Sequence, residues 1–233
     1  MKDKIIVALD VSSSDKALQL VSELHDLVAM FKVGSQLFTA CGPQIVRQII
    51  GTGGNVFLDL KFHDIPNTVT HAVREAAALG VSMMTVHASG GRAMMQSASK
   101  DLHEKFGSKS PLVVAITVLT SFDTRALFEI GVEIPLGEQV QRLALFAQEC
   151  GMDGIVCSPQ EIQLVRKSVN STFKIVTPGI RMPDQSLNDQ QRIATPHEAL
   201  AAGADYIVVG RAVTEDPNPR AATERLLKLA QRS

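Results

Sequence analysis

The sequence predicts an α/β fold, a TIM (β/α)8 barrel that spans residues 1–233 as a single domain. The first observation is that short runs rich in Val and Ile alternate with longer segments of helical periodicity. The second is that these runs are almost continuously apolar, as parallel strands covered on both faces should be. The third is length, because 233 residues suit a barrel of roughly 250 residues. An open, doubly wound sheet is the alternative fold.

The expected strands recur at regular intervals along the chain. They cover residues 4–10, 31–34, 55–60, 82–87, 112–118, 154–157, 173–177 and 206–210. Helical periodicity marks residues 14–24, 68–79, 91–106, 138–150 and 219–231. Gly80, Gly151 and Gly203 follow helical stretches, where a glycine commonly ends a helix. No composition shift or low-complexity linker divides the chain, so we expect one domain.

Composition argues against several classes of protein. The formal net charge of −1 offers no basic surface for nucleic acid or an anionic membrane. No apolar run approaches the roughly 20 residues that span a bilayer, and the first apolar run is too short for a signal peptide. Cys41, Cys150 and Cys157 lack metal-ligand spacing and suggest reduced thiols. We therefore expect a cytoplasmic protein without a metal site.

Charged residues gather at the predicted C-terminal strand ends, where barrel enzymes carry their chemistry. Asp10 ends the first strand, Lys32 lies on the second, and Asp59 and Lys61 end the third, followed by Asp64. Asp59 and Lys61 are two residues apart, so alternation along a strand predicts that they share a face. We expect an alternating Lys–Asp–Lys–Asp array. The alternatives are a buried ion-pair cluster that only fixes strand register and, for Asp10, a helix cap.

Two further features follow the last two strands. Gly210 and Arg211 stand where many barrels bind phosphate, because glycine admits close backbone approach and arginine a bidentate contact. The polar stretch 178–192 is long for a loop of this kind and suggests a lid. The alternatives are an ordinary turn and a surface excursion. His63 and His87, near strand ends, are expected to pack or to hydrogen-bond around the site.

Residues 59–68 read Asp-Leu-Lys-Phe-His-Asp-Ile-Pro-Asn-Thr, which resembles the signature of the orotidine 5′-phosphate decarboxylase family. The resemblance extends over the whole chain. It includes the motifs at residues 7–10, 31–34, 86–91, 177–181 and 209–211. Their order and spacing resemble the bacterial members.

The resemblance implies a homodimer with active sites at the subunit interface and neither metal nor organic cofactor. Orotidine 5′-monophosphate would lose CO2 to give uridine 5′-monophosphate. Lys32, Asp59 and Lys61 would come from one subunit, while Asp64 and Thr68 reach in from the other. Lys61 would stabilise and then protonate a carbanion at C6. Asp59 and Asp64 would hold Lys61 in place and keep it charged.

The resemblance also implies substrate contacts. Asp10 and Lys32 would contact the ribose hydroxyls, and the segment around Thr120 the pyrimidine. Four residues would hold the phosphate and close the lid: Arg181, Gln190, Gly210 and Arg211. Ile65 and Pro178, which lie within the matching motifs, complete the expected binding set.

Two rival functions remain at this point. A Mg²⁺-dependent sugar-phosphate lyase or decarboxylase of the same superfamily would share the Asp-x-Lys-x-x-Asp stretch. Lys32 argues against it, because a cation stands where an acidic group would help to hold the metal. A non-catalytic phosphoribosyl-binding barrel would need the phosphate residues but not the Lys–Asp array.

Overall fold

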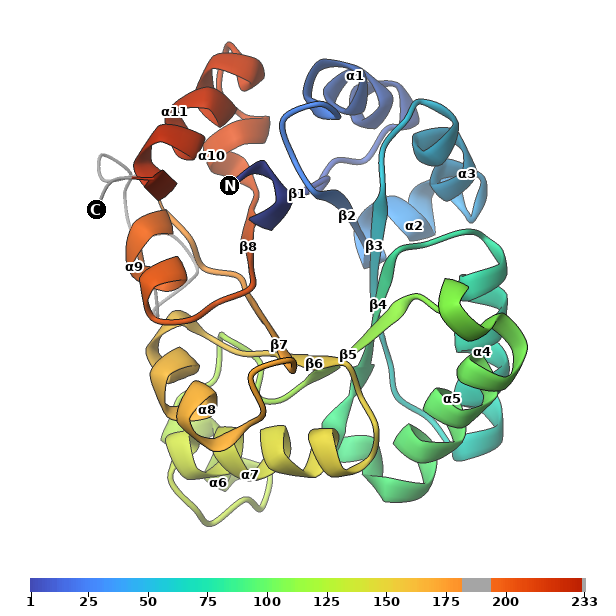
Figure 1. The fold of residues 1–233 in the computed structure, drawn as a ribbon, viewed down its shortest axis with the longest axis vertical. Helices are drawn as coiled ribbons and strands as arrows, with labels where there is room; N and C mark the ends of the chain where they lie inside the picture. The colour runs from blue at the N-terminus through green and yellow to red at the C-terminus, as the bar shows by residue number, and fades with distance from the viewer. Residues whose placement is uncertain (182–193, 232–233) are drawn as a thin grey trace.

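The computed structural model describes residues 1–181 and 194–231, and in it eight parallel strands close into a barrel in sequence order (Figure 1). The strands are β1 Ile5–Ala8, β2 Met30–Gly34, β3 Val56–Phe62, β4 Met83–His87, β5 Leu112–Ile116, β6 Gly154–Val156, β7 Lys174–Thr177 and β8 Tyr206–Val209. β1 pairs with both β2 and β8, which closes the sheet. The predicted (β/α)8 barrel is confirmed, and the open-sheet alternative is wrong.

Helices form a ring around the strands (Figure 1). They are α1 Ser14–Leu24, α2 Ser35–Cys41, α3 Gln44–Gly51, α4 Pro66–Ala78, α5 Gly91–Phe106, α6 Thr124–Glu129, α7 Leu136–Glu149, α8 Ile162–Ser168, α9 Pro196–Ala201, α10 Arg211–Thr214 and α11 Pro219–Gln231. Ser13 caps α1 by accepting a hydrogen bond from the Lys16 amide, which agrees with the serine-rich start of this segment.

Two apolar cores follow from the alternation of side chains along each strand. One lies between the strands and the helices and includes Leu58, Met84 and Val86. The other fills the barrel itself. It contains Ile6, Ala8, Met30, Phe57, Met83, Val114, Val176 and Val208. The filled interior closes the barrel to through-passage, so a ligand can enter only at an end.

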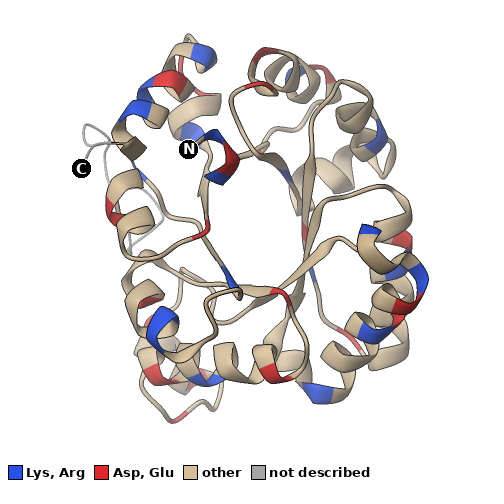
Figure 2. Ribbon diagram, in the orientation of Figure 1, with Lys and Arg blue, Asp and Glu red and all other residues tan. Residues whose placement is uncertain are grey.

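The first and last helices are joined across the point of closure. Arg220 on α11 donates hydrogen bonds to both carboxylate oxygens of Asp26 at 2.9 and 2.8 Å and to the Glu23 carbonyl at 2.8 Å. The Arg220 hydrogen bond lowers the pKa of Asp26 to about 2. Most other charges lie on the surrounding helices, and few lie on the strands (Figure 2). Within the described residues, no helix is long and apolar enough to span a membrane.

Aspartates secure the N-terminal end of the barrel. The Asp153 carboxylate, just before β6, accepts a 2.8 Å hydrogen bond from the Val113 amide of β5. The Asp205 carboxylate, just before β8, accepts a 2.9 Å bond from the Ile175 amide of β7. In each case the aspartate side chain accepts a hydrogen bond from a backbone amide near the start of the preceding strand. This end of the barrel therefore serves stability and leaves the opposite end for ligands.

Candidate active site

A pocket of about 500 Å³ opens at the C-terminal ends of the strands. It brings together most of the residues predicted to form the site: Asp10, Lys32, Asp59, Lys61, Thr120, Pro178, Arg181, Gly210 and Arg211. These residues come from six different strands or the loops that follow them, so only the closed barrel unites them. The pocket lies above the inner core, since Ala8, Phe57 and Val208 belong to both.

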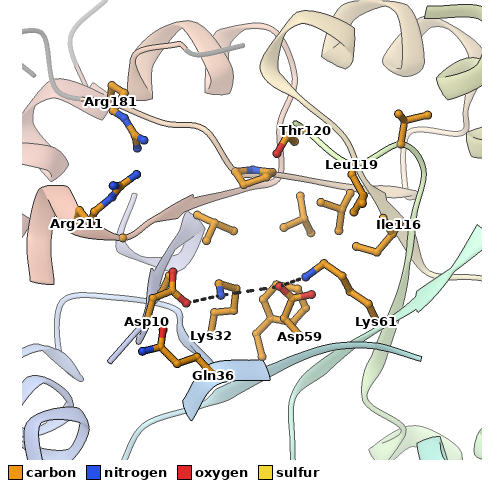
Figure 3. A pocket seen from close by; sticks show the side chains of 18 of the residues that line it. Asp10, Lys32, Gln36, Asp59, Lys61, Ile116, Leu119, Thr120, Arg181 and Arg211 are labelled. Atoms are coloured by element: carbon orange, nitrogen blue, oxygen red, sulfur yellow. Dashed lines mark hydrogen bonds and ion pairs between the residues drawn. The ribbon is translucent and has the colours of Figure 1, made fainter. Parts of the chain in front are cut away.

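Four of these residues form a continuous chain of alternating charges (Figure 3). The Lys32 ammonium lies 3.0 Å from Asp10 Oδ1 and 3.8 Å from Asp59 Oδ2. The Lys61 ammonium donates to the same Asp59 Oδ2 at 2.8 Å. Asp59 is therefore the centre of the chain, with one ammonium on either side.

Burial differs along this chain of charges. The side chains of Lys32 and Asp59 are only 13% and 12% exposed, whereas those of Lys61 and Asp10 are 37% and 55% exposed. Charges interact more strongly away from water, so the inner pair forms a fixed base for the outer two groups. All four groups line the pocket, and Lys61 and Asp10 are the more exposed of them.

The backbone around Lys61 departs from a regular strand, which corrects the predicted end of strand 3 at residue 60. β3 runs to Phe62, and its register against β4 shifts between Leu58 and Phe62. Lys61 has φ of +53°, and it is the one non-glycine among the described residues with positive φ. This left-handed conformation costs about 1–2 kcal/mol in a non-glycine residue. Asp59 and Lys61 do meet, but through this irregular turn of the chain and not through simple alternation.

A buried threonine behind this turn was not predicted. Thr85 on β4 is fully buried, accepts a hydrogen bond from the Lys61 amide at 2.8 Å and donates one to Asp59 Oδ1 at 3.0 Å. The sequence could have indicated this position, because side chains alternate along a strand and Met83 points into the barrel, so residue 85 points inward too. Thr85 thus contacts both partners of the Asp59–Lys61 ion pair.

His63 and His87 pack against each other beside the site, in agreement with the expectation of a packing role. Their rings stack with centroids 5.1 Å apart and planes inclined by 29°. Burial lowers the pKa of His87, the electrostatic effects of His63 and Lys61 act in the same direction, and that of Asp59 opposes them. The lowered pKa favours the neutral form of His87 beside Lys61.

Asp64 does not join the array within its own chain, so the spacing along strand 3 does not by itself supply the fourth member of the predicted Lys–Asp–Lys–Asp array. It is exposed, and its carboxylate accepts a 2.6 Å hydrogen bond from the next amide, that of Ile65. The reason is that β3 ends at Phe62, which leaves Asp64 in the loop before α4. Thr68 is likewise exposed and Ile65 is 65% exposed, and neither lines the pocket. Asp10, and not Asp64, is the fourth member of the chain of charges.

The opposite side of the pocket carries the cationic end. The guanidinium groups of Arg181, after β7, and Arg211, after β8, both point into the pocket across from the chain of charges (Figure 3). Gly210 lies next to Arg211, on the side of the chain of charges. A Cβ atom at Gly210 would stand 3.7 Å from Asp10 Oδ2, at the end of that chain of charges. Two arginines on one wall form a site for a dianionic group such as a phosphate. Gln190 lies outside the described residues.

Other residues line the pocket that sequence reasoning did not select. The polar ones include Gln36 and Glu215, and the apolar ones include Ile116 and Leu119. Ile116 could have been found, because it ends β5 and shares the inward face with Val114. Val118, Val156 and Val176 also line the pocket, and Figure 3 shows Ile116 and Leu119 on the same side of it as Lys61.

Comparisons with known proteins show the family to which the chain belongs. Residues 3–226 match the model of the Orotidine 5′-phosphate decarboxylase / HUMPS family. The chain is 50% identical over 230 residues to the orotidine 5′-phosphate decarboxylase of Syntrophotalea carbinolica, covering 97% of this chain and 94% of the relative. It is similar to the crystal structure of the Lactobacillus acidophilus enzyme of the same name, with a TM-score of 0.86, 37% identity and coverage of 98% and 99%. The chain belongs to the orotidine 5′-phosphate decarboxylase / HUMPS family.

Proposed function

We propose that this protein decarboxylates orotidine 5′-monophosphate to uridine 5′-monophosphate and CO2 in pyrimidine nucleotide biosynthesis. The observation that carries the proposal is the charge chain Asp10–Lys32–Asp59–Lys61 facing Arg181 and Arg211 across one pocket. A nucleoside monophosphate has a dianion at one end and a polar base at the other. The pocket offers matching groups at its two ends. The similar proteins of Syntrophotalea carbinolica and Moorella thermoacetica are both named orotidine 5′-phosphate decarboxylase.

The substrate is oriented by this division of the pocket. Arg181 and Arg211 hold the phosphate, with the Gly210 backbone beside it. Asp10 and Lys32 lie between the arginines and Lys61, where the ribose hydroxyls would be bound (Figure 3). The base then lies against Thr120 and Pro178, with C6 directed to Lys61.

The chemistry consists of one bond cleavage and one proton transfer. The bond between C6 and the carboxylate carbon breaks, CO2 leaves, and the electron pair stays on C6. The Lys61 ammonium stabilises this charge in a site poor in water and donates a proton to C6. Asp59, 2.8 Å away, holds the Lys61 ammonium in place through an ion pair. A proton from solvent restores the ammonium after product release.

We also propose that the active form is a homodimer with shared sites. Asp64, Ile65 and Thr68 are exposed on the segment that follows β3, outside the pocket of their own chain. An isoleucine that is 65% exposed, beside the exposed carboxylate of Asp64, suits a surface that a second copy covers. In the dimer, Asp64 and Thr68 of each subunit complete the site of the other.

The proposal requires neither a metal nor an organic cofactor. The Lys32 ammonium lies 3.0 Å from Asp10 and 3.8 Å from Asp59, so it occupies the space between two carboxylates that a divalent metal would otherwise bridge. This disfavours the Mg²⁺-dependent lyase. We further propose that residues 1–233 act as one domain in the cytoplasm, which agrees with the free thiols of Cys41, Cys150 and Cys157.

The direct test is the loss of orotidylate absorbance on addition of the purified protein. We expect turnover that is unchanged after treatment with EDTA and dialysis. Turnover abolished by EDTA and restored by Mg²⁺ would favour the metal-dependent rival. Nucleotide binding without any turnover would favour a non-catalytic binding protein.

A further inference from the structure

We infer that Thr85 is a positioning residue that fixes the Lys61 ammonium for catalysis by joining the Lys61 backbone to the Asp59 carboxylate. The inference rests on the proposed function, because it assigns Thr85 a part in that reaction. It begins from the register of β3 and β4. Leu58 pairs with Met84 and Phe62 with Val86, so residues 59–61 lie opposite Thr85 alone.

This mismatch removes Lys61 from the regular ladder of backbone hydrogen bonds. A parallel ladder has no second acceptor on β4 for the additional residues, and the left-handed conformation of Lys61, with φ of +53°, turns its amide away from the usual direction. The amide finds its acceptor in the Thr85 hydroxyl at 2.8 Å. The side chain of Thr85 thus takes the place of a backbone carbonyl and holds the irregular turn.

The direction of the hydrogen bonds is determined by the groups involved. The Lys61 amide can only donate, so Thr85 Oγ1 accepts there and has its own proton free to give. That proton goes to Asp59 Oδ1 at 3.0 Å. The other Asp59 oxygen accepts from the Lys61 ammonium at 2.8 Å. The result is a closed ring in which Lys61 is held at both its backbone and its side-chain end.

Burial makes Thr85 suited to this task. Its exposure is 0%, so no water competes for the hydroxyl, and each partner would lose a hydrogen bond without replacement if the hydroxyl were removed. Thr85 is not among the residues that line the pocket, so it would not touch a ligand bound there. Its effect must therefore pass through Asp59 and Lys61. Misplacing a reacting group by about 1 Å can cost about a hundredfold in rate.

The experiment compares Thr85→Val, which keeps the shape but lacks the hydroxyl, with Thr85→Ser, which keeps the hydroxyl. We expect Thr85→Val to lower kcat by about tenfold to a hundredfold with KM changed less than about threefold, because the groups that hold ribose and phosphate are untouched. Thr85→Ser should recover kcat to within about threefold of the unaltered protein. Thr223→Val is the matched control, since Thr223 is equally buried and donates to the Pro219 carbonyl on α11.

Several outcomes would overturn the inference. They are a normal kcat in Thr85→Val, a loss expressed in KM alone, a Thr85→Ser protein as impaired as Thr85→Val, or an equal loss of kcat in Thr223→Val. If Thr85→Val does not fold, Thr85→Ala replaces it, because alanine places no methyl group against the Asp59 carboxylate. Crystal structures give a readout that needs no activity. The Lys61 ammonium should leave Asp59 in the hydroxyl-free variant and stay in Thr85→Ser, and an unmoved ammonium would refute the role even if the proposed function itself failed.

Discussion

The Lys61 ammonium and the Asp59 carboxylate lie 2.8 Å apart at the mouth of the barrel, on a strand segment whose backbone is irregular between them. Asp59 has a second cation, Lys32, at 3.8 Å. One carboxylate therefore serves two ammonium groups of different exposure. Lys32 is nearly covered, and Lys61 faces the pocket. The more exposed cation, Lys61, is the one proposed to act on C6, and the more covered one, Lys32, is proposed to bind the ribose.

Lys61→Ala should abolish decarboxylation while nucleotide binding remains. The change removes both the charge that stabilises the carbanion and the proton donor, so we expect kcat to fall by at least about 10⁴-fold. Binding of uridine 5′-monophosphate, measured by calorimetry, should persist, because the arginines and Asp10 are unaltered. Lys100→Ala, on the exposed face of α5, is the control and should retain full activity. Near-normal turnover by Lys61→Ala would refute the role of Lys61.

Mixed dimers test whether the sites are shared. Lys61→Ala and Asp64→Ala subunits should each be inactive as homodimers, because every site then lacks one group. In a heterodimer, one of the two sites contains both lesions and the other contains neither. Mixing should therefore restore up to about half of the activity per heterodimer, measured by the absorbance assay. Subunit exchange is verified by mass spectrometry, and exchange without recovery would contradict a shared site.

Removing an arginine should weaken phosphate binding. Arg211→Ala is expected to raise KM by about tenfold to a hundredfold, which corresponds to the loss of about 1.5–3 kcal/mol in hydrogen bonds to a charged group. The nucleoside orotidine, which has no phosphate, should be turned over equally poorly by Arg211→Ala and the unaltered protein. Arg142→Ala, at an exposed position of α7, provides the control. An equal loss of activity on orotidine 5′-monophosphate and on orotidine would mean that Arg211 does not act through the phosphate.

The placement of the charged residues was largely predictable from the sequence. The closed barrel brings every C-terminal strand end to one mouth, so Asp10, Lys32 and Asp59 could be assigned to a common site once the strands were recognised. Period-two alternation is sufficient to turn such residues inward. The fold itself followed from the same apolar runs, although the ends of strands such as β3 differed and the shorter helices, such as α2 and α6, were not predicted.

The details around Lys61 were not predictable, because they depend on pairing between strands. The register shift of β3 against β4 arises from contacts between residues about 24 positions apart, such as Lys61 and Thr85. A lysine also gives no local sign of a positive φ, which glycine or asparagine would give. The direction of Asp64 depends on the loop after β3, where no periodicity applies. These positions are set by tertiary structure and not by local pattern.

Asp153→Asn should stabilise the fold at neutral pH. Burial raises the pKa of Asp153, with the Val113 hydrogen bond only partly opposing it. An acid with a raised pKa in the folded state binds its proton more tightly there than in the unfolded chain. Its contribution to stability therefore falls as pH rises above the ordinary value of 3.8, until the folded state too is ionised. Asparagine keeps an acceptor for the Val113 amide but carries no charge, which removes this loss.

The measurement is the free energy of unfolding of both proteins by urea denaturation between about pH 4 and pH 8. The advantage of Asp153→Asn should be smallest at the acid end and should grow towards neutral pH. Asp153→Ala is the matched control, because it removes the charge and also leaves the Val113 amide without its 2.8 Å acceptor, at a cost of about 1–3 kcal/mol. An advantage of Asp153→Asn that is greatest at acid pH would show that the sign of the pKa shift is wrong. Equal stability of the Asn and Ala variants would show that the hydrogen bond to β5 contributes nothing.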